Sequence, residues 1–290
     1  MSAHSESARL KSVFLKHAKD AFISDSQLAG QWQELNYLNK PHFDQALEEY
    51  RHFENLLKQH EVDIHYFPRH DDVSIDSIYC RDASITTDKG VIICNMGKSG
   101  RVQEPTACKN AYQQADIPIL GEITAPGTLE GGDVAWLRPD LLAVGHTYRT
   151  NEAGIAQLKA LLRPLGVEVV VASMPHYKGP EDVFHLMSVF SPVDDDLAVV
   201  YSPLMPINFR NTLLDLGYDL AEVPDEEFES MGCNVLAVAP RHCIMVSGNP
   251  RTKSLLEEKD CVVEEYNGNE ISIKGGGGPT CLTRPLERTA

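Results

Sequence analysis

The chain has 290 residues, of which 42% are hydrophobic and 23% charged, so it can bury a full core as one large domain or two smaller ones. Its formal net charge of -16 argues against nucleic acid or an anionic membrane as a partner and favours a small cationic molecule. The N-terminal residues show no basic region followed by an apolar one, and no apolar run is long enough to span a bilayer. We therefore expect a cytoplasmic protein.

The predicted elements, in chain order, repeat one unit of strand, turn, strand, helix and strand. Residues 13–15 predict a strand, 43–60 a helix with one apolar face, and 62–67 another strand. Later units are complete: strands 141–145 and 167–172 around a helix at 152–165, strands 197–201 and 219–223 around 209–216, and strands 242–247 and 262–266 around 252–258.

Each unit begins with a short apolar run that opens on one leading residue. These residues follow one another at intervals of 51, 52, 49 and 47, and they are Asp82, Asp133, His185, Asn234 and Cys281. The fifth unit is incomplete at the C-terminus, and the N-terminal elements supply its remainder, so the termini share one unit and close a ring.

The repeat predicts an α/β fold, a five-bladed α/β propeller of five modules with approximate fivefold symmetry, formed by one domain over residues 1–290. In such a ring the leading residues converge on the axis. A simpler interpretation is that strand starts merely favour polar residues.

Cys281 follows four glycines, Gly275 to Gly278. Glycine runs are tolerable where backbone must turn tightly or lie against a ligand, so Cys281 is a candidate nucleophile; the alternative is a frayed tail with an incidental thiol. The seven cysteines contain no CxxC pair and no zinc-like spacing, so we expect reduced thiols, at most one of them chemical.

His185 is the candidate partner of Cys281, because an imidazole can adjust the ionisation of a thiol and then protonate a leaving group. Glu130 is the candidate carboxylate that orients His185. It lies in Glu130-Gly-Gly-Asp133, a tight bend that brings two carboxylates close to a ligand, although Asp133 could simply form a turn.

Two further carboxylates, Asp76 and Asp82, suit a planar guanidinium through forked hydrogen bonds. Arg149 and Arg101 are candidates for holding a substrate carboxylate, and each could otherwise be an ordinary surface arginine. Other motifs are weaker. Gly97-Lys98-Ser99 lacks the first glycine of a phosphate-binding loop, and the five-residue spacing of His60, His65 and His70 does not predict a metal site.

Jointly, Arg81-Asp82, Glu130-Gly-Gly-Asp133, His185-Leu and Gly-Gly-Gly-Gly-Pro-Thr-Cys281 resemble the guanidino-group modifying enzymes of the pentein fold, most of all the dimethylarginine dimethylaminohydrolases. The resemblance covers nearly the whole chain. It implies no cofactor and no metal, a small guanidino substrate and a hydrolase that converts dimethylarginine to citrulline and dimethylamine through a covalent thiouronium on Cys281. A homodimer is a further expectation.

The resemblance also implies a role for each candidate residue. Cys281 is the nucleophile, His185 protonates the leaving amine and then activates water, and Glu130 orients His185; the substrate-binding residues are Asp76, Asp82, Arg149, Arg101 and Asp133.

Two departures leave the substrate open. Arg81 stands where dimethylarginine enzymes usually have an acidic residue, as in arginine deiminases, whereas Met187 stands where those deiminases usually have an aspartate. Arginine deiminase, arginine dihydrolase and amidinotransferase activities therefore remain alternatives. Outside enzymes, the chain could resemble the ribosomal anti-association factor, a binding scaffold that needs no nucleophile, histidine or paired carboxylates.

Overall fold

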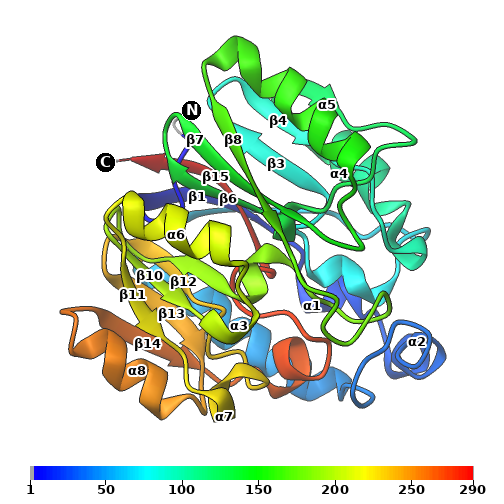
Figure 1. The fold of residues 1–290 in the computed structure, drawn as a ribbon. Coiled ribbons are helices and arrows are strands. Elements are labelled where there is room, and N and C mark those ends of the chain that lie inside the picture. The colour runs from blue at the N-terminus through cyan, green and yellow to red at the C-terminus, as the bar shows by residue number, and fades with distance from the viewer. Residues whose placement is uncertain (1–2, 290) are drawn as a thin grey trace.

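Five small three-stranded sheets form the framework of the protein, seen in a computed structural model that describes residues 3–289 (Figure 1). In each sheet the middle strand pairs antiparallel with the first and parallel with the third. The sheets are β15 (Thr283–Thr289), β1 (Arg9–Leu15) and β2 (Asp63–Tyr66); β3 (Ser84–Thr87), β4 (Gly90–Ile93) and β5 (Ile119–Glu122); β6 (Val134–Arg138), β7 (Leu141–His146) and β8 (Glu168–Ser173); β9 (Phe190–Pro192), β10 (Leu197–Val200) and β11 (Asp219–Glu222); and β12 (Leu236–Ala239), β13 (His242–Val246) and β14 (Val262–Tyr266).

The connection between the two parallel strands of every sheet contains a helix, because parallel neighbours require a crossover. These helices are α3 (Phe43–Gln59), α4 (Glu104–Gln114), α5 (Glu152–Leu162), α6 (Ile207–Asp215) and α8 (Pro250–Glu257). Each sheet and its helix thus form one module, and the five-module α/β propeller architecture predicted from the repeat is confirmed.

Most predicted elements lie within a few residues of the observed ones, with one larger error. The strand expected from His185 begins only at Phe190, because residues Leu186–Ser188 form a tight 3₁₀ turn, η5. The short helices α1 (Ala18–Ala21), α2 (Asp25–Gln31) and α7 (Asp225–Phe228) were not predicted.

The N- and C-terminal strands share a sheet. β15 pairs antiparallel with β1, with Leu15 opposite Thr283 and Arg9 opposite Thr289, so the first and last segments of the chain lie side by side (Figure 1). This pairing places Cys281, two residues before β15, beside the N-terminal segment. The prediction of a single domain over 1–290 stays a prediction.

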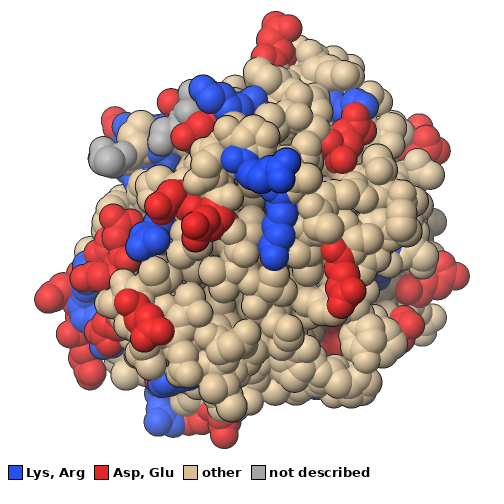
Figure 2. Space-filling view, turned by 45° about the horizontal axis from the view of Figure 1, so that its top comes forward, with Lys and Arg blue, Asp and Glu red and all other residues tan. Residues whose placement is uncertain are grey.

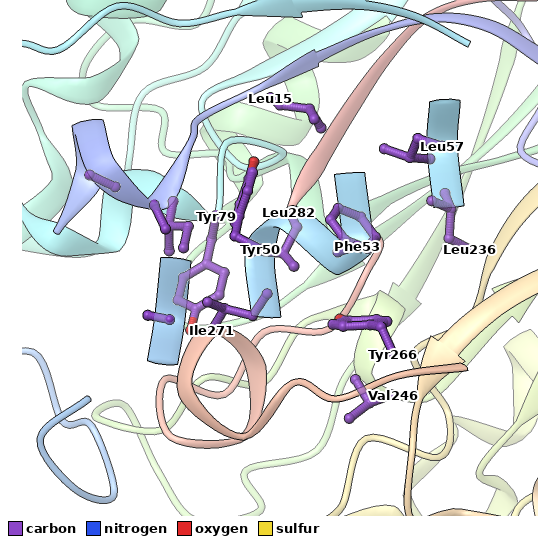
Figure 3. Packing of buried hydrophobic residues seen from close by; sticks show 14 of the residues in the cluster. Leu15, Tyr50, Phe53, Leu57, Tyr79, Leu236, Val246, Tyr266, Ile271 and Leu282 are labelled. Atoms are coloured by element: carbon purple, nitrogen blue, oxygen red, sulfur yellow. The ribbon is translucent and has the colours of Figure 1, made fainter. Parts of the chain in front are cut away.

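The core beneath α3 reaches almost to Cys281. Tyr50, Phe53 and Leu57 of α3 belong to one core cluster with Leu282 and with Ile271 of the π-helical turn η7 (Asn269–Ile273), and Figure 3 shows Tyr50 and Phe53 beside Leu282. Burying aromatic and aliphatic side chains is the main stabilising term of such an interface, about 1.5 to 3 kcal/mol for each fully buried side chain. The residue that follows the candidate nucleophile is therefore fixed in a dense apolar core.

Acidic and basic side chains are interspersed on the face shown in Figure 2, where acidic groups gather toward the rim on the left and much of the centre is uncharged. Among residues 3–289, no helix is both long and apolar enough to cross a membrane.

Candidate active site

The five leading residues lie at neighbouring points of one hydrogen-bonded centre. Asp82 Oδ1 accepts the Gly132 N–H at 2.9 Å, Asp133 Oδ1 accepts the Leu186 N–H at 3.0 Å, and Asn234 Nδ2 lies 3.5 Å from Cys281 Sγ. Each contact joins two different modules. The structure thus brings together residues that the chain separates by about fifty positions.

A single cavity is lined by six of the eight candidate site residues: Asp76, Asp82, Arg101, Arg149, His185 and Cys281. Glu130 and Asp133 are fully buried behind its wall. A wider cleft shares Cys281 and His185 with this cavity and adds apolar side chains, among them Phe184, Met187, Met231 and Ile273.

The glycine run that precedes Cys281 is packed, not frayed. A Cβ on Gly277 would lie 2.4 Å from the Tyr79 ring, and one on Gly278 would lie 2.4 Å from Asn234 Oδ1. Gly276 has a φ of +78°, a left-handed conformation that favours glycine. Side chains are therefore excluded here because the loop lies directly against Tyr79 and Asn234.

Asn234 holds the loop that carries the thiol from two directions. Its Oδ1 accepts the Thr280 N–H at 3.0 Å and the Thr280 hydroxyl at 2.9 Å, while its Nδ2 faces the Cys281 sulfur. The repeat identified Asn234 as a leading residue but predicted no role for it. Its polar side chain at that position was the feature that could have indicated a role in the site.

Cys281 rests as a thiol. Burial raises the pKa of Cys281 above its ordinary value and the Asp82 carboxylate raises it further, against the hydrogen bonds from Thr280 and Asn234. The other six cysteines are buried and free, whereas Cys281 is partly accessible. A bound guanidinium would lower the pKa of this thiol, because it supplies positive charge beside the sulfur.

His185 and Glu130 form a buried pair in which His185 Nε2 lies 2.8 Å from Glu130 Oε2. Burial alone would lower the pKa of His185, but the carboxylates of Asp133, Asp82 and Glu130 raise it to about 9. Burial alone would raise the pKa of Glu130, but His185 and Arg149 hold it well below its usual value. The imidazole is thus cationic at neutral pH.

Backbone donors fix the other oxygen of Glu130. Its Oε1 accepts the N–H groups of Gly97 and Lys98, each at 3.0 Å. The Glu130 carboxylate therefore links the loop that contains Lys98 to His185, and its charge-assisted hydrogen bonds fix the orientation of the carboxylate.

Asp133 lies behind His185 and supports its backbone. Besides the Leu186 N–H, it accepts the Thr147 hydroxyl at 2.7 Å, and it is completely buried. Burial raises the pKa of Asp133 to about 6. Asp133 does not line either cavity, unlike the other predicted substrate-binding residues.

Arg101 is engaged by the protein itself. Its guanidinium donates to Asp82 Oδ2 at 2.5 Å, to Glu104 at 2.8 and 2.9 Å, and to the Tyr79 carbonyl at 2.9 Å. With a longer bond to the Asp76 carbonyl, Arg101 donates five hydrogen bonds to the protein, and one of them fixes the orientation of Asp82. Glu104, the residue that anchors Arg101, was not predicted as part of the site.

Asp76 is paired with Lys98. In the sequence, Lys98 stood out only as part of Gly97-Lys98-Ser99, which does not match a phosphate-binding loop. Lys98 Nζ lies 2.6 Å from Asp76 Oδ2 and 2.9 Å from the Leu35 carbonyl. The two predicted guanidinium-binding aspartates are therefore each neutralised by a cation of the protein, Asp76 by Lys98 and Asp82 by Arg101.

Arg149 extends along the cavity with one weak ion pair and one long hydrogen bond. Its Nη1 lies 3.6 Å from Glu130 Oε2 and its Nη2 donates to the Asp182 carbonyl at 3.4 Å. Arg149 has fewer protein partners than Arg101, so its guanidinium is better placed to accept a ligand carboxylate.

Arg81 and Met187, the two departures from the family pattern, differ in location. Arg81 is buried and donates to Glu6 at 2.8 Å, away from the cavity. Met187 lines the cleft that contains Cys281 and His185. Arg81 therefore helps to hold the N-terminal segment through Glu6, whereas Met187 places an apolar side chain near Cys281 and His185.

Asp82, Glu130 and His185 lie close enough to hold a metal ion, with ligand atoms all within 4.8 Å of one another. Their oxygens are already used, however: Glu130 accepts from two backbone N–H groups and His185, and Asp82 from Arg101 and Gly132. The cations Arg101 and Arg149 beside them oppose a further positive ion.

The family model for N,N dimethylarginine dimethylhydrolase, eukaryotic, matches residues 24–288. The chain belongs to this family. It is an enzyme of the guanidino-group modifying pentein superfamily, a hydrolase of carbon–nitrogen bonds in linear amidines.

Individual relatives agree with this assignment at low identity. The dimethylarginine dimethylaminohydrolase of Pseudomonas aeruginosa is 27% identical over 249 residues, which cover 86% of this chain and 91% of that enzyme. A solved structure of the Pseudomonas enzyme with citrulline covers 96% of this chain and all of that chain, with a TM-score of 0.78 and 22% identity, and it supports the fold. An arginine deiminase of Streptococcus agalactiae is 26% identical over 72% of this chain and 60% of its own length.

Proposed function

We propose that this dimethylarginine dimethylhydrolase family member hydrolyses the guanidino carbon–nitrogen bond of a methylated arginine, converting N-omega,N-omega-dimethylarginine to citrulline and dimethylamine. One observation carries the proposal: a partly accessible cysteine and a histidine held from behind by a buried glutamate line a single cavity, which two carboxylates suited to a guanidinium also line. We take residues 1–290 as one catalytic unit with a small guanidino molecule as its ligand.

Cys281 is the proposed nucleophile, and its sulfur attacks the guanidino carbon once the substrate cation has favoured the thiolate. The tetrahedral adduct collapses as His185 gives its proton to the departing dimethylamine, leaving a thiouronium bonded to Cys281. Water then attacks the same carbon while the neutral His185 takes a proton. The sulfur is then expelled as a thiolate while the hydroxyl of the adduct loses its proton to form the ureido carbonyl, and the thiolate takes up a proton to restore the thiol that lost one before the attack.

The surrounding carboxylates and arginines have distinct proposed roles. Asp82, oriented by Arg101, accepts hydrogen bonds from the guanidinium; Arg149 binds the substrate carboxylate; Asp133 positions His185 through the Leu186 backbone. Lys98 occupies one Asp76 oxygen, Oδ2, so the proposed role of Asp76 in substrate binding requires the substrate cation either to use the other oxygen or to displace Lys98.

Met187 favours an alkylated nitrogen. A carboxylate at this place would bind an unsubstituted guanidinium N–H, whereas a thioether packs against methyl groups and would leave such an N–H without a partner. Because Met187 lines the cleft beside His185, the apolar surface lies where the leaving amine would be.

Ammonia release from arginine is the second candidate. It is supported by the arginine deiminase relatives and by Arg81, which stands where dimethylarginine enzymes usually carry an acid. A dihydrolase or an amidinotransferase would use the same covalent step, and their products, ornithine or a new guanidino compound, distinguish them.

Product analysis tests the proposal. The protein is incubated with arginine, monomethylarginine and asymmetric dimethylarginine, and citrulline, ornithine, ammonia and methylated amines are quantified. We expect dimethylamine and citrulline in equal amounts and no turnover by Cys281→Ser, with Cys261→Ser as the matched control. Full turnover by Cys281→Ser would exclude the mechanism, and ammonia as the main nitrogen product would exclude the methylated substrate.

Gel filtration with light scattering measures whether the enzyme is a homodimer.

A further inference from the structure

Two histidines and a glutamate form a cluster on the surface that the proposed reaction does not use. His60 directly follows α3, His242 is the first residue of β13, and Glu264 lies in β14. Their ligand atoms all lie within 4.8 Å of one another. Both imidazole Nε2 atoms approach the same oxygen, Glu264 Oε2, with His242 at 3.2 Å and His60 closer.

The fold brings these three residues together at the edge of a packed interface. In the parallel pair of β13 and β14, Glu264 lies opposite Ile244, so His242, two residues before Ile244, shares the face of Glu264. That face packs against α3: Ile244 and Leu57 belong to one core cluster, and Figure 3 shows Leu57 beside Leu236 of the same sheet. His60 follows Leu57 by three residues and therefore lies at the rim.

The donor set suits a divalent transition ion. Two imidazole nitrogens and one carboxylate oxygen are ligands of borderline softness, the combination typical of zinc sites with three protein ligands. The side chains are partly accessible, at 19% for His60, 32% for His242 and 27% for Glu264, which leaves a side open to water. His60 also follows the last turn of α3, where the helix dipole favours a cation.

We propose that His60, His242 and Glu264 bind a divalent transition metal ion, for which zinc is the appropriate probe, with water completing the coordination. The ion links α3, which belongs to the module of β1, β2 and β15, to the module of β12, β13 and β14. It is a structural clip between two modules and takes no part in bond cleavage. The proposal is independent of the guanidino chemistry.

Zinc titration calorimetry on the Cys281→Ser protein tests this site, because removing the thiol prevents zinc from binding the nucleophile. We expect one zinc ion to bind and the affinity to fall more than about tenfold in His60→Ala, His242→Ala and Glu264→Gln. His52→Ala is the matched control, since His52 is an exposed histidine of the same helix. Zinc should raise the Tm of the parent by a few degrees and leave that of His60→Ala unchanged.

Cobalt spectroscopy provides a second readout on the protein with Cys281 intact. A nitrogen–oxygen site gives cobalt d–d bands without thiolate charge transfer, and these bands should disappear in His242→Ala. Glu264→Gln, nearly isosteric with the parent, separates loss of a ligand from loss of folding, because its Tm without metal should match the parent. Equal zinc affinity in the three variants and the control, or cobalt bands that require Cys281, would overturn the proposal.

Discussion

Glu130 Oε2 lies 2.8 Å from His185 Nε2 while its Oε1 accepts two backbone N–H groups, so the carboxylate cannot rotate without losing charged hydrogen bonds. This anchoring, together with Asp133 and Asp82, raises the pKa of His185 to about 9 and keeps the imidazole protonated at neutral pH. A protonated imidazole can donate its proton to a departing amine, which is the first requirement of the proposed mechanism.

Glu130→Gln should lower kcat about 100- to 1000-fold. The amide can still accept the Gly97 and Lys98 N–H groups, but its NH₂ group then faces His185 Nε2, which favours the wrong tautomer and removes a charge that supports the imidazolium. The alkaline limb of the pH–kcat profile should move to lower pH. Glu122→Gln, at an ion pair with Lys109 on the surface, is the control. An unchanged alkaline limb would contradict the pairing of Glu130 with His185.

Alkylation of Cys281 by iodoacetamide should accelerate with pH to values above the ordinary pKa of a cysteine. The reagent is neutral and reacts with the thiolate, and burial with Asp82 raises the pKa of Cys281. Asn234→Ala removes the hydrogen bond to the sulfur, so the inflection should move to still higher pH and the rate at pH 8 should fall several-fold. The Cys281→Ser protein supplies the baseline. An inflection below pH 7 would instead reveal a resting thiolate–imidazolium pair.

Lys98→Met should reveal whether Asp76 can bind the substrate guanidinium. The substitution removes the ammonium that now lies 2.6 Å from Asp76 and 2.9 Å from the Leu35 carbonyl, which frees the Asp76 carboxylate on the cavity wall. We expect KM for dimethylarginine to fall about tenfold, since one charge-assisted hydrogen bond contributes about 1.5 to 3 kcal/mol. KM for the analogue without the α-ammonium should fall by a similar factor, because that analogue keeps the guanidinium.

The control for this variant is Lys109→Met, which breaks an ion pair on the surface. An equal rise in KM for dimethylarginine and for the analogue without the α-ammonium would show that Lys98 itself binds the substrate, most simply by contacting the substrate carboxylate.

Gly278→Ala should reduce activity with little loss of fold stability. The added Cβ would lie 2.4 Å from Asn234 Oδ1, so the loop must shift and carry the Cys281 sulfur with it. We expect kcat to fall at least about 100-fold, because misplacement of reacting atoms by about 1 Å has effects of this size. Gly30→Ala is the control, since no heavy atom lies within 4 Å of a Cβ there. Wild-type alkylation and turnover in Gly278→Ala would show that the loop adapts freely.

The strand repeat and the leading residues could be predicted because they depend on local patterns. Alternating strands and turns are visible in residues 197–223 and 242–266, and polar residues at fixed intervals mark where the modules meet. The start of β9 was misplaced because residues 186–190, all apolar except Ser188, resemble a strand. In the structure the His185 N–H donates to Ser188 Oγ and the Leu186 N–H donates to Asp133, which closes a turn.

The cations of the site were harder to predict. Lys98 and Arg101 lie in a loop region without periodicity, and nothing in their sequence surroundings shows that they neutralise Asp76 and Asp82 across the cavity. The glycine run was recognised as special, but its cause, close packing against Tyr79 and Asn234, depends on contacts between distant segments. Long-range electrostatic partners and steric limits of this kind exist only in the folded chain.

The pairing of β1 with β15 makes the position of Cys281, two residues before β15, depend on a contact between the two ends of the described chain. Residues 9–15 must wait for residues 283–289 before their sheet is complete, a contact between the most distant segments of the sequence. Closing so long a loop is slow compared with forming local structure. In a partly folded chain that has built the other four modules, we therefore expect Glu130, Asp133 and His185 to be in place before Cys281, so that the site is complete only when β15 pairs with β1.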